Sequence, residues 1–230
     1  MPLSRRFRII PQSMKSAFDL VIFDMDGTLL DSMGCLADWI HRAVKEHCPP
    51  SVTPASITAA FGPTERRIIE KFVTKDMVQP CLNAYHELYE SEHDRIYVYP
   101  GIDLLLREMH RKGIPMALCT GKSRRAVEIS LELLDWEDIF GEIITGDDTK
   151  NPKPDPEGVN FILERTKAGR KRTIFIGDGA ADTGAALGAG IICGRAEWGE
   201  PGSLPAGSAQ PDYRFTTPQE FLNVLEGIVS

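Results

Sequence analysis

The chain has little that would tie it to a membrane, a nucleic acid or an oxidising compartment. Its 230 residues contain no apolar stretch of membrane-spanning length. The formal net charge is -7, so there is no overall basic field to hold a polyanion. The five cysteines are odd in number and form no C-x-x-C pair, which argues against a disulfide framework or structural zinc. We therefore expect a cytoplasmic protein without a nucleic-acid or membrane partner.

The first 17 residues contain no acidic side chain but four basic ones. Transit peptides share this bias, so an organellar targeting arm over residues 1–13 is one interpretation. We favour a flexible N-terminal arm over residues 1–17, with Met14 rather than Met1 as the natural start. The whole chain is 42% hydrophobic and 26% charged, as in ordinary globular proteins, and its length fits one large domain or a domain with an insertion.

An apolar run from Leu20 to Phe23 is followed directly by two carboxyl groups. Such a run is typical of a strand buried on both faces of a parallel sheet. Asp24 and Asp26 come next, and Gly27 allows a tight turn. Carboxylates at the carboxyl end of a buried parallel strand lie where open α/β sheets bind ligands. Asp-Gly is also ordinary turn chemistry, so this stretch alone leaves both interpretations open.

Residues 32–97 predict an all-helical insertion. The apolar residues of 32–47 recur at helical spacing, and Pro49-Pro50 ends that helix. Thr53 followed by Pro54 is typical of a helix start, Thr64 predicts a helix through Phe72, and a long helix is expected over 76–96. No convincing strand pattern is present here. We expect these residues to form a separate helical domain.

From Tyr97 onward, strand and helix patterns alternate. This order implies a parallel sheet with helices on both faces, the α/β class. We therefore assign residues 18–31 and 98–230 to one α/β core domain that is interrupted by the helical insertion. The expected strands cover residues 20–23, 114–119, 142–145, 173–176 and 191–193, with a Gly/Pro-rich loop over 201–211 and a closing helix over 218–228.

Polar residues follow several of these strands, and parallel strands end at the same sheet edge. Thr120-Gly121-Lys122 follows the second expected strand and Asp178 the fourth, with Lys153 and Asp182 in nearby segments. Asp24, Asp26 and Asp178 offer the hard oxygen ligands that Mg²⁺ prefers. Thr120 and the next amide can bind phosphoryl oxygens at a helix start, and Lys153 supplies a point charge.

The segments DMDGTLLDS, TGK, KPDP and GDGAAD stand in this order along the chain. Together they resemble the haloacid dehalogenase-like superfamily of phosphohydrolases, and most closely the branch with phosphoglycolate phosphatase and β-phosphoglucomutase. The resemblance covers residues 18 to about 215. It implies a Rossmann-like core, a helical cap, a small phosphorylated metabolite as substrate and Mg²⁺ as cofactor.

The resemblance also implies roles for individual residues. Asp24 would be the nucleophile that accepts the phosphoryl group, and Asp26 the general acid/base. Thr120, with Gly121 and Lys122, would bind the phosphoryl group, and Lys153 would neutralise charge. Mg²⁺ would be held by Asp24, by the main-chain carbonyl of Asp26, by Asp178 and by Asp182.

Substrate contacts from the insertion are the least determined part of the pattern. Phe61-Gly62-Pro63 resembles the family's cap loop, so Arg66 and Arg67 are the preferred candidates. A solvated helix position is the alternative for each arginine. Which substrate is used, and whether the protein is a monomer or a homodimer, stay open.

Several other functions compete with a phosphatase. A mutase would share the core residues and differ in the cap, and a phosphonate hydrolase would need a cap lysine such as Lys45. Haloacid dehalogenase itself lacks an acid at the position of Asp26. Gly177-x-Gly179 hints at a dinucleotide-binding oxidoreductase, but Asp182 stands where that motif needs Gly or Ala. A non-catalytic binding protein on this fold would be expected to have lost a catalytic carboxyl group, and none is missing.

Overall fold

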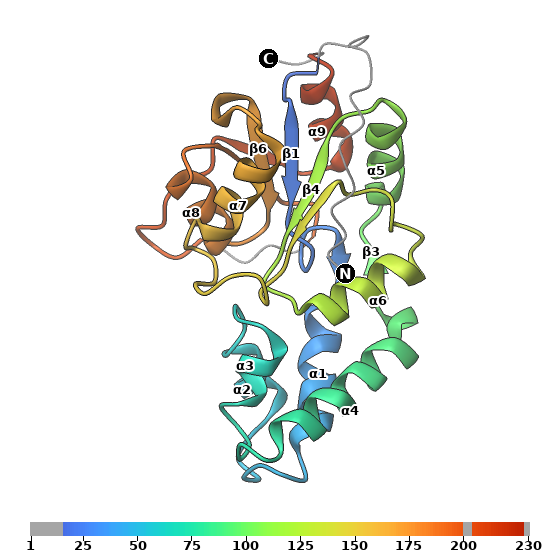
Figure 1. Ribbon diagram of the computed structural model, residues 1–230, viewed down its shortest axis with the longest axis vertical. Helices are drawn as coiled ribbons and strands as arrows, with labels where there is room; N and C mark the ends of the chain where they lie inside the picture. The colour runs from blue at the N-terminus through green and yellow to red at the C-terminus, as the bar shows by residue number, and fades with distance from the viewer. Residues whose placement is uncertain (1–15, 200–203, 228–230) are drawn as a thin grey trace.

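The computed structural model describes residues 16–199 and 204–227. Its main sheet contains six strands, which pair only in parallel, in the order β5-β4-β1-β6-β7-β8. Figure 1 shows β1 between β6 and β4. The central position of β1 explains its unbroken apolar sequence, because both of its faces and both of its edges are covered. The strands are β1 (Leu20–Phe23), β4 (Met116–Cys119), β5 (Glu142–Ile144), β6 (Thr173–Gly177), β7 (Ile192–Ala196) and β8 (Tyr213–Phe215).

Helices cover both faces of this sheet, as the alternating strand and helix patterns predict. Side chains of β1 alternate between two apolar cores: Val21 and Phe23 belong to one, Leu20 and Ile22 to the other. The first core also contains side chains of α5, α6 and α9, and the second those of α7 and α8. These helices are α5 (Ile102–Arg111), α6 (Arg124–Leu133), α7 (Glu157–Thr166), α8 (Ala180–Gly188) and α9 (Pro218–Leu225).

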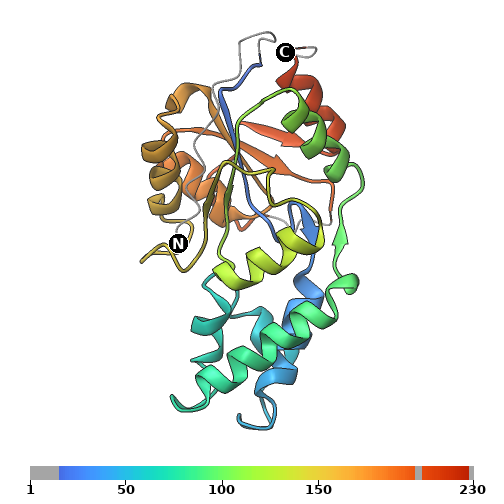
Figure 2. The ribbon, with the colours of Figure 1, turned by 45° about the vertical axis from the view of Figure 1, so that its right-hand side comes forward.

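A helical insertion, defined here as residues 33–95, lies beyond the carboxyl ends of the strands (Figures 1 and 2). It is joined to the core by a short antiparallel ribbon of two strands, which bring the two connections side by side. The strands are β2 (Leu30–Asp31) and β3 (Tyr97–Val98). The helices of the insertion are α1 (Met33–Val44), α2 (Pro54–Thr58), α3 (Glu65–Ile69), α4 (Val78–Ser91) and the 3₁₀ turn η1 (His93–Arg95).

Side-chain caps begin several helices where the residue types predict them. Thr53 and Ser56 form a reciprocal capping box at α2, with Pro54 as the first helical residue. Thr64 caps α3, which ends at Ile69 in a series of turns rather than continuing as a helix to residue 72. All five cysteines are free. Within the described ranges, no helix is long and apolar enough to cross a membrane.

Two features of the sheet arrangement differ from the sequence expectation. The ribbon of β2 and β3 has only two residues per strand, too few for an alternating pattern to be recognised. Strand β8 (Tyr213–Phe215) adds a sixth, parallel strand beside β7, where the sequence predicts only a loop and a closing helix. Two of its three residues are exposed, so it lacks the buried apolar run that marks the other strands of this sheet. The expected N-terminal arm falls largely on residues 1–15, outside the described residues.

Candidate active site

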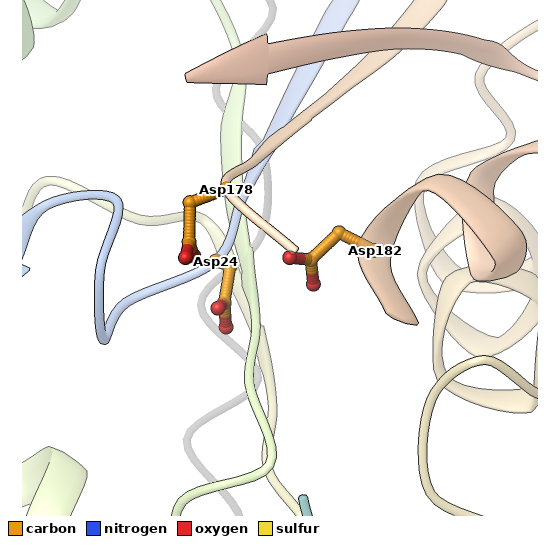
Figure 3. A group of neighbouring side chains, drawn as sticks. All are labelled: Asp24, Asp178 and Asp182. Atoms are coloured by element: carbon orange, nitrogen blue, oxygen red, sulfur yellow. The ribbon is translucent and has the colours of Figure 1, made fainter. Parts of the chain in front are cut away.

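Three carboxyl groups converge at the carboxyl edge of the sheet (Figure 3). Asp24 follows β1 and Asp178 follows β6, and these strands are hydrogen-bonded neighbours with Phe23 opposite Ile176. Asp182 lies in the first turn of α8, directly after the same edge. One oxygen from each of the three carboxyl groups lies within 4.8 Å of the others. The predicted acids Asp24, Asp178 and Asp182 thus form one cluster.

The turn after β1 approaches this cluster so closely that only glycine fits at one position. Gly27 has φ +80°, and a Cβ on it would lie 2.7 Å from Cγ of Asp178. The neighbouring Thr28 hydroxyl donates a hydrogen bond to Asp178 Oδ1 at 3.2 Å. The same turn therefore carries the first acids and holds the carboxyl group from the neighbouring strand.

Lys153 links two of the acids from the opposite side. Its Nζ lies 2.8 Å from Asp24 Oδ1 and 2.6 Å from Asp182 Oδ1, and donates to the carbonyl of Cys119 at 3.3 Å. Burial disfavours the charged ammonium, but Asp182 and Asp24 together raise the pKa of Lys153 above its usual value. Lys153 is therefore a fixed positive charge inside the acid cluster.

One lysine does not balance three acids. Burial, reinforced by Asp182 and Asp178 and opposed by Lys153, raises the pKa of Asp24 to about 7. Burial and Asp182 likewise raise the pKa of Asp178 to about 6. The cluster thus has oxygen donors and an uncompensated negative charge, the combination that a hard divalent cation such as Mg²⁺ fits. Asp24, Asp178 and Asp182 are the side chains that could hold one.

Asp26 has a different environment from Asp24, although only one residue separates them. The Ser32 hydroxyl donates to Asp26 Oδ1 at 2.5 Å, and Lys122 Nζ lies 3.0 Å from the same oxygen. Lys122 is fully buried with its ammonium over the ring of Tyr89, 4.8 Å from the centroid. Despite burial, Asp26 and Tyr89 raise its pKa. Asp26 is therefore held apart from the acid cluster by its own partners.

The turn after β4 brings the core and the insertion into contact. Thr120 is buried, and its hydroxyl accepts a hydrogen bond from the Lys122 amide at 3.3 Å. A Cβ on Gly121 would lie 2.5 Å from the carbonyl oxygen of Gly62 in the insertion, so the two backbones meet there with no room for a side chain. The predicted Thr120-Gly121-Lys122 turn therefore borders both the acid cluster and the insertion.

A cavity of about 270 Å³ lies between these two parts of the molecule. Its core wall carries the acids, with Thr120, Lys122 and Lys153. Its insertion wall is mostly apolar and carries one acid. The side chains of the insertion wall are those of Met33, Leu36, Ile40, Phe61, Pro63, Ile68 and the acidic Glu65.

The two predicted substrate arginines lie elsewhere in this conformation. Arg66 donates to Gln79 Oε1 within the insertion. Arg67 reaches across to the core, where it donates to the main-chain carbonyls of Lys150 at 3.2 Å and Thr149 at 3.3 Å. Arg67 lines a smaller neighbouring cavity, and neither arginine is among the described residues that line the larger one. Substrate contact by Arg66 or Arg67 stays a prediction.

Glu65 is a site residue that sequence reasoning missed. It is only 5% exposed, and its Oε2 accepts a hydrogen bond from the Ser123 amide at 2.9 Å. Its Oε1 accepts from the Tyr85 hydroxyl at 3.2 Å. These partners are 58 and 20 residues away in sequence. The one available signal was its place directly after Thr64, next to the Phe61-Gly62-Pro63 turn.

Acids at the switch from β1 to β6 in an open parallel sheet define the ligand site of an α/β protein. A family model described as haloacid dehalogenase-like hydrolase matches residues 21–195. The chain therefore belongs to this family. The match spans the acid cluster, Lys153 and the whole helical insertion, which agrees with the resemblance that the four motifs indicate.

Similar proteins bear related names. The chain is 31% identical over 211 residues to a phosphoglycolate phosphatase of Vibrio cholerae, which covers 87% of this chain and 93% of that protein. It is 26% identical over 208 residues to the pyrophosphatase PpaX of Bacillus velezensis, with 89% and 94% covered. The structure of CbbY from Rhodobacter sphaeroides in complex with phosphate superposes with a TM-score of 0.77 at 21% identity, covering 91% of this chain and 99% of that one. The last likeness shows a shared fold.

Proposed function

We propose that the chain is a Mg²⁺-dependent phosphatase that hydrolyses a small phosphomonoester through an aspartyl-phosphate on Asp24. The observation that carries this proposal is the position of Asp24. Its carboxyl group borders the cavity, 2.8 Å from Lys153 and within the same acid cluster as Asp178 and Asp182. The two relatives named as phosphatases of small phosphorylated compounds support the same class of reaction.

In the first step, one Asp24 oxygen attacks phosphorus and the bond from phosphorus to the leaving oxygen breaks. The attacking form is the carboxylate, which Lys153 favours at 2.8 Å. A bound Mg²⁺ would supply further positive charge to Asp24 and to the phosphoryl oxygens. Lys153 and the buried Thr120 border the space beside Asp24, where they can bind phosphoryl oxygens as charge develops on them.

Asp26 is the proposed proton carrier. It gives a proton to the leaving oxygen in the first step and takes one from the water that hydrolyses the aspartyl-phosphate in the second. Its carboxyl group lines the cavity and is oriented by Ser32 and Lys122. The separate partners of Asp24 and Asp26 support this division of roles between two identical side chains.

The helical insertion is the proposed cap. Its two connections to the core run together through β2 and β3, so a change in these few residues would move the whole insertion as one body. Closure over the sheet edge would exclude bulk water from the aspartyl-phosphate. Lys45, the cap lysine that a phosphonate hydrolase would need, is not among the described cavity-lining residues. Its Nζ lies 3.9 Å from Oε1 of Glu46.

Trapping of the phosphoenzyme tests the proposal. We expect hydrolysis of phenyl phosphate with Mg²⁺, its loss in excess EDTA, and recovery when Mg²⁺ is restored. Asp24→Asn should form no phosphoenzyme and should lose about 10⁴-fold or more in turnover, as expected for loss of a nucleophile. Asp26→Asn should slow turnover least with p-nitrophenyl phosphate, whose leaving group needs no proton.

Asp31 offers a matched control, because this exposed acid belongs to the same segment and does not line the cavity. Asp31→Asn should keep wild-type rates within about twofold. Phosphoenzyme on Asp24→Asn protein, or full activity after thorough chelation, would contradict the proposed function.

A further inference from the structure

One potential anion-binding position beside the cavity is already occupied by acidic side chains of the protein. Helix α6 (Arg124–Leu133) begins beside the cavity, and the free amides of a helix start attract anions. The Ser123 amide at this start donates to Glu65 of the insertion at 2.9 Å. The next amide, that of Arg124, donates to Asp147 at 2.9 Å. A second anionic group on a substrate finds both of these donors occupied by carboxylates.

Glu65 is firmly held in this position. The Tyr85 hydroxyl donates to its other oxygen at 3.2 Å, and the whole residue is 5% exposed. Tyr85 is itself fully buried in the insertion. Glu65 therefore presents a fixed negative charge to the cavity, at the junction between the insertion and the core.

The lysines that line the cavity already lie beside its acids. Within residues 16–199 and 204–227, the lysines that line it are Lys122 and Lys153. Lys122 is paired with Asp26 at 3.0 Å, and Lys153 with Asp24 and Asp182. The positive charge of Lys153 faces the position proposed for the transferring phosphoryl group. Among the described residues of the insertion wall there is no Lys or Arg that could pair with another anion.

We propose that the substrates are phosphomonoesters whose leaving group carries no second anionic group and places an apolar body against Leu36, Ile68 and Phe61. This inference rests on the proposed phosphatase function and specifies its substrate class. A carboxylate or second phosphate on the leaving group would meet Glu65 and an apolar wall, and would lose its hydration without a partner. The cavity of about 270 Å³ limits the leaving group to a small molecule.

The same arrangement opposes the mutase alternative. A phosphomutase must hold a sugar that carries a second phosphate while the first is transferred. The insertion wall would have to offer a cation or free amides for that group, and it offers the carboxylate of Glu65 instead. The chemistry of the insertion wall thus favours hydrolysis of a singly phosphorylated compound.

The test compares two esters that differ by one charge. Phenyl phosphate and 4-carboxyphenyl phosphate have the same ring and scissile bond, and the carboxylated phenol is the slightly better leaving group. We expect kcat/KM with Mg²⁺ to be about tenfold or more higher for phenyl phosphate, because a like charge is not compensated in a partly desolvated site. For the same reason, kcat/KM should be higher for ethyl phosphate than for phosphoglycolate.

Two variants locate the cause. Glu65→Gln keeps an acceptor for the Ser123 amide and removes the charge, so it should lower the preference for phenyl phosphate by about threefold or more. Met33→Arg adds a cation to the wall at a residue that is 40% exposed and so can accept a longer side chain. It should lower KM for the carboxylated ester, whereas the neutral control Met33→Gln should leave the preference unchanged.

Each result separates this inference from the function on which it rests. Hydrolysis of 4-carboxyphenyl phosphate or phosphoglycolate at least as efficiently as the neutral ester would overturn the substrate class and leave the phosphatase intact. A preference that survives unchanged in both Glu65→Gln and Met33→Arg would overturn the assigned cause. Hydrolysis of none of the esters, with Mg²⁺ and a folded protein by circular dichroism, would overturn the proposed function and the substrate class together.

Discussion

The two walls of the cavity differ in almost every physical respect. The core wall is built from polar residues that follow β1, β4 and β6 and from Lys153 in the loop after β5, and it carries acids, lysines and a buried threonine. The insertion wall is built from α1, α3 and the turn before α3, and it is apolar apart from Glu65. Under the proposed function, the core would perform the reaction and the insertion would select the leaving group.

This division follows from how each wall is held. The strands that position the core acids are paired on both edges and buried on both faces, so their ends have little freedom. The insertion is joined to the core through β2 and β3 and packs on it through α4 beside α6, with shared apolar packing and buried polar contacts such as that of Glu65 with Ser123. Precise chemistry suits the first arrangement, and opening for a substrate suits the second.

The largest effect on turnover should come from replacing Lys153 in the core wall. Lys153→Ala leaves Asp24 and Asp182 without their ammonium partner, so we expect turnover of phenyl phosphate to fall by about 10²-fold or more. Lys150→Ala is a matched control, because this exposed lysine lies in the same loop and is not among the described residues that line the cavity. Steady-state kinetics with circular dichroism would make the comparison. Similar losses in both variants would mean that the loop, rather than the charge, matters.

The core wall was also the part that sequence could anticipate. Asp24, Thr120 and Asp178 each follow a short apolar run, and parallel strands bring such residues to one edge whatever the details of the loops. The five expected strands and the closing helix lie within a few residues of their predicted ranges, because each contains apolar residues that mark its position in the sequence. Lys153 lies in a loop, and only the KPDP motif pointed to it.

The insertion wall could not be anticipated in the same way. The apolar spacing of α1 predicts a helix with one buried face, but it does not distinguish burial against α4 from exposure to a cavity. Glu65 depends on Tyr85 and Ser123, and no local pattern encodes a contact across 58 residues. The strands β2 and β3 were missed because two residues cannot show an alternation, and β8 was missed because two of its three residues are exposed and it forms no apolar run.

A smaller effect is expected on the stability of the protein, whose dependence on pH reports the charge of the acids in the core wall. Asp24 and Asp178 have pKa values raised to about 7 and about 6, well above the ordinary value near 4. Between about pH 4 and pH 7 the folded, metal-free protein therefore holds protons that the unfolded chain has released, and its stability falls as pH rises through this window. A divalent cation must displace these protons, so its stabilising effect should grow over the same range.

Thermal unfolding with and without 10 mM Mg²⁺ measures this. We expect the rise in Tm caused by Mg²⁺ to be small at pH 5 and larger by about 2–4 °C at pH 8, as about 1 kcal/mol of added stabilisation gives for a chain of this size. Asp178→Asn should lose most of the increase. An equal shift at both pH values, or one that survives in Asp178→Asn, would show that Mg²⁺ binds outside the acid cluster.

The smallest effects should come from the outer side of the insertion wall, where Arg66 and Arg67 lie. Arg66 pairs with Gln79 and Glu70 inside the insertion, so Arg66→Ala should change kcat/KM by less than about twofold. Arg67 bonds the core carbonyls of Lys150 and Thr149, so Arg67→Ala should weaken the closed arrangement and raise KM by a few-fold.

The decisive measurement is the ratio of the Arg67→Ala effects on two substrates. An arginine that only holds the insertion against the core acts equally on phenyl phosphate and 4-carboxyphenyl phosphate, because neither ester touches it. An arginine that turns into the cavity during the reaction would attract the carboxylate, and its loss would impair the carboxylated ester more. We expect equal effects. A selective loss for the charged ester would show that the insertion wall supplies a cation after all, and that its apolar character belongs only to this conformation.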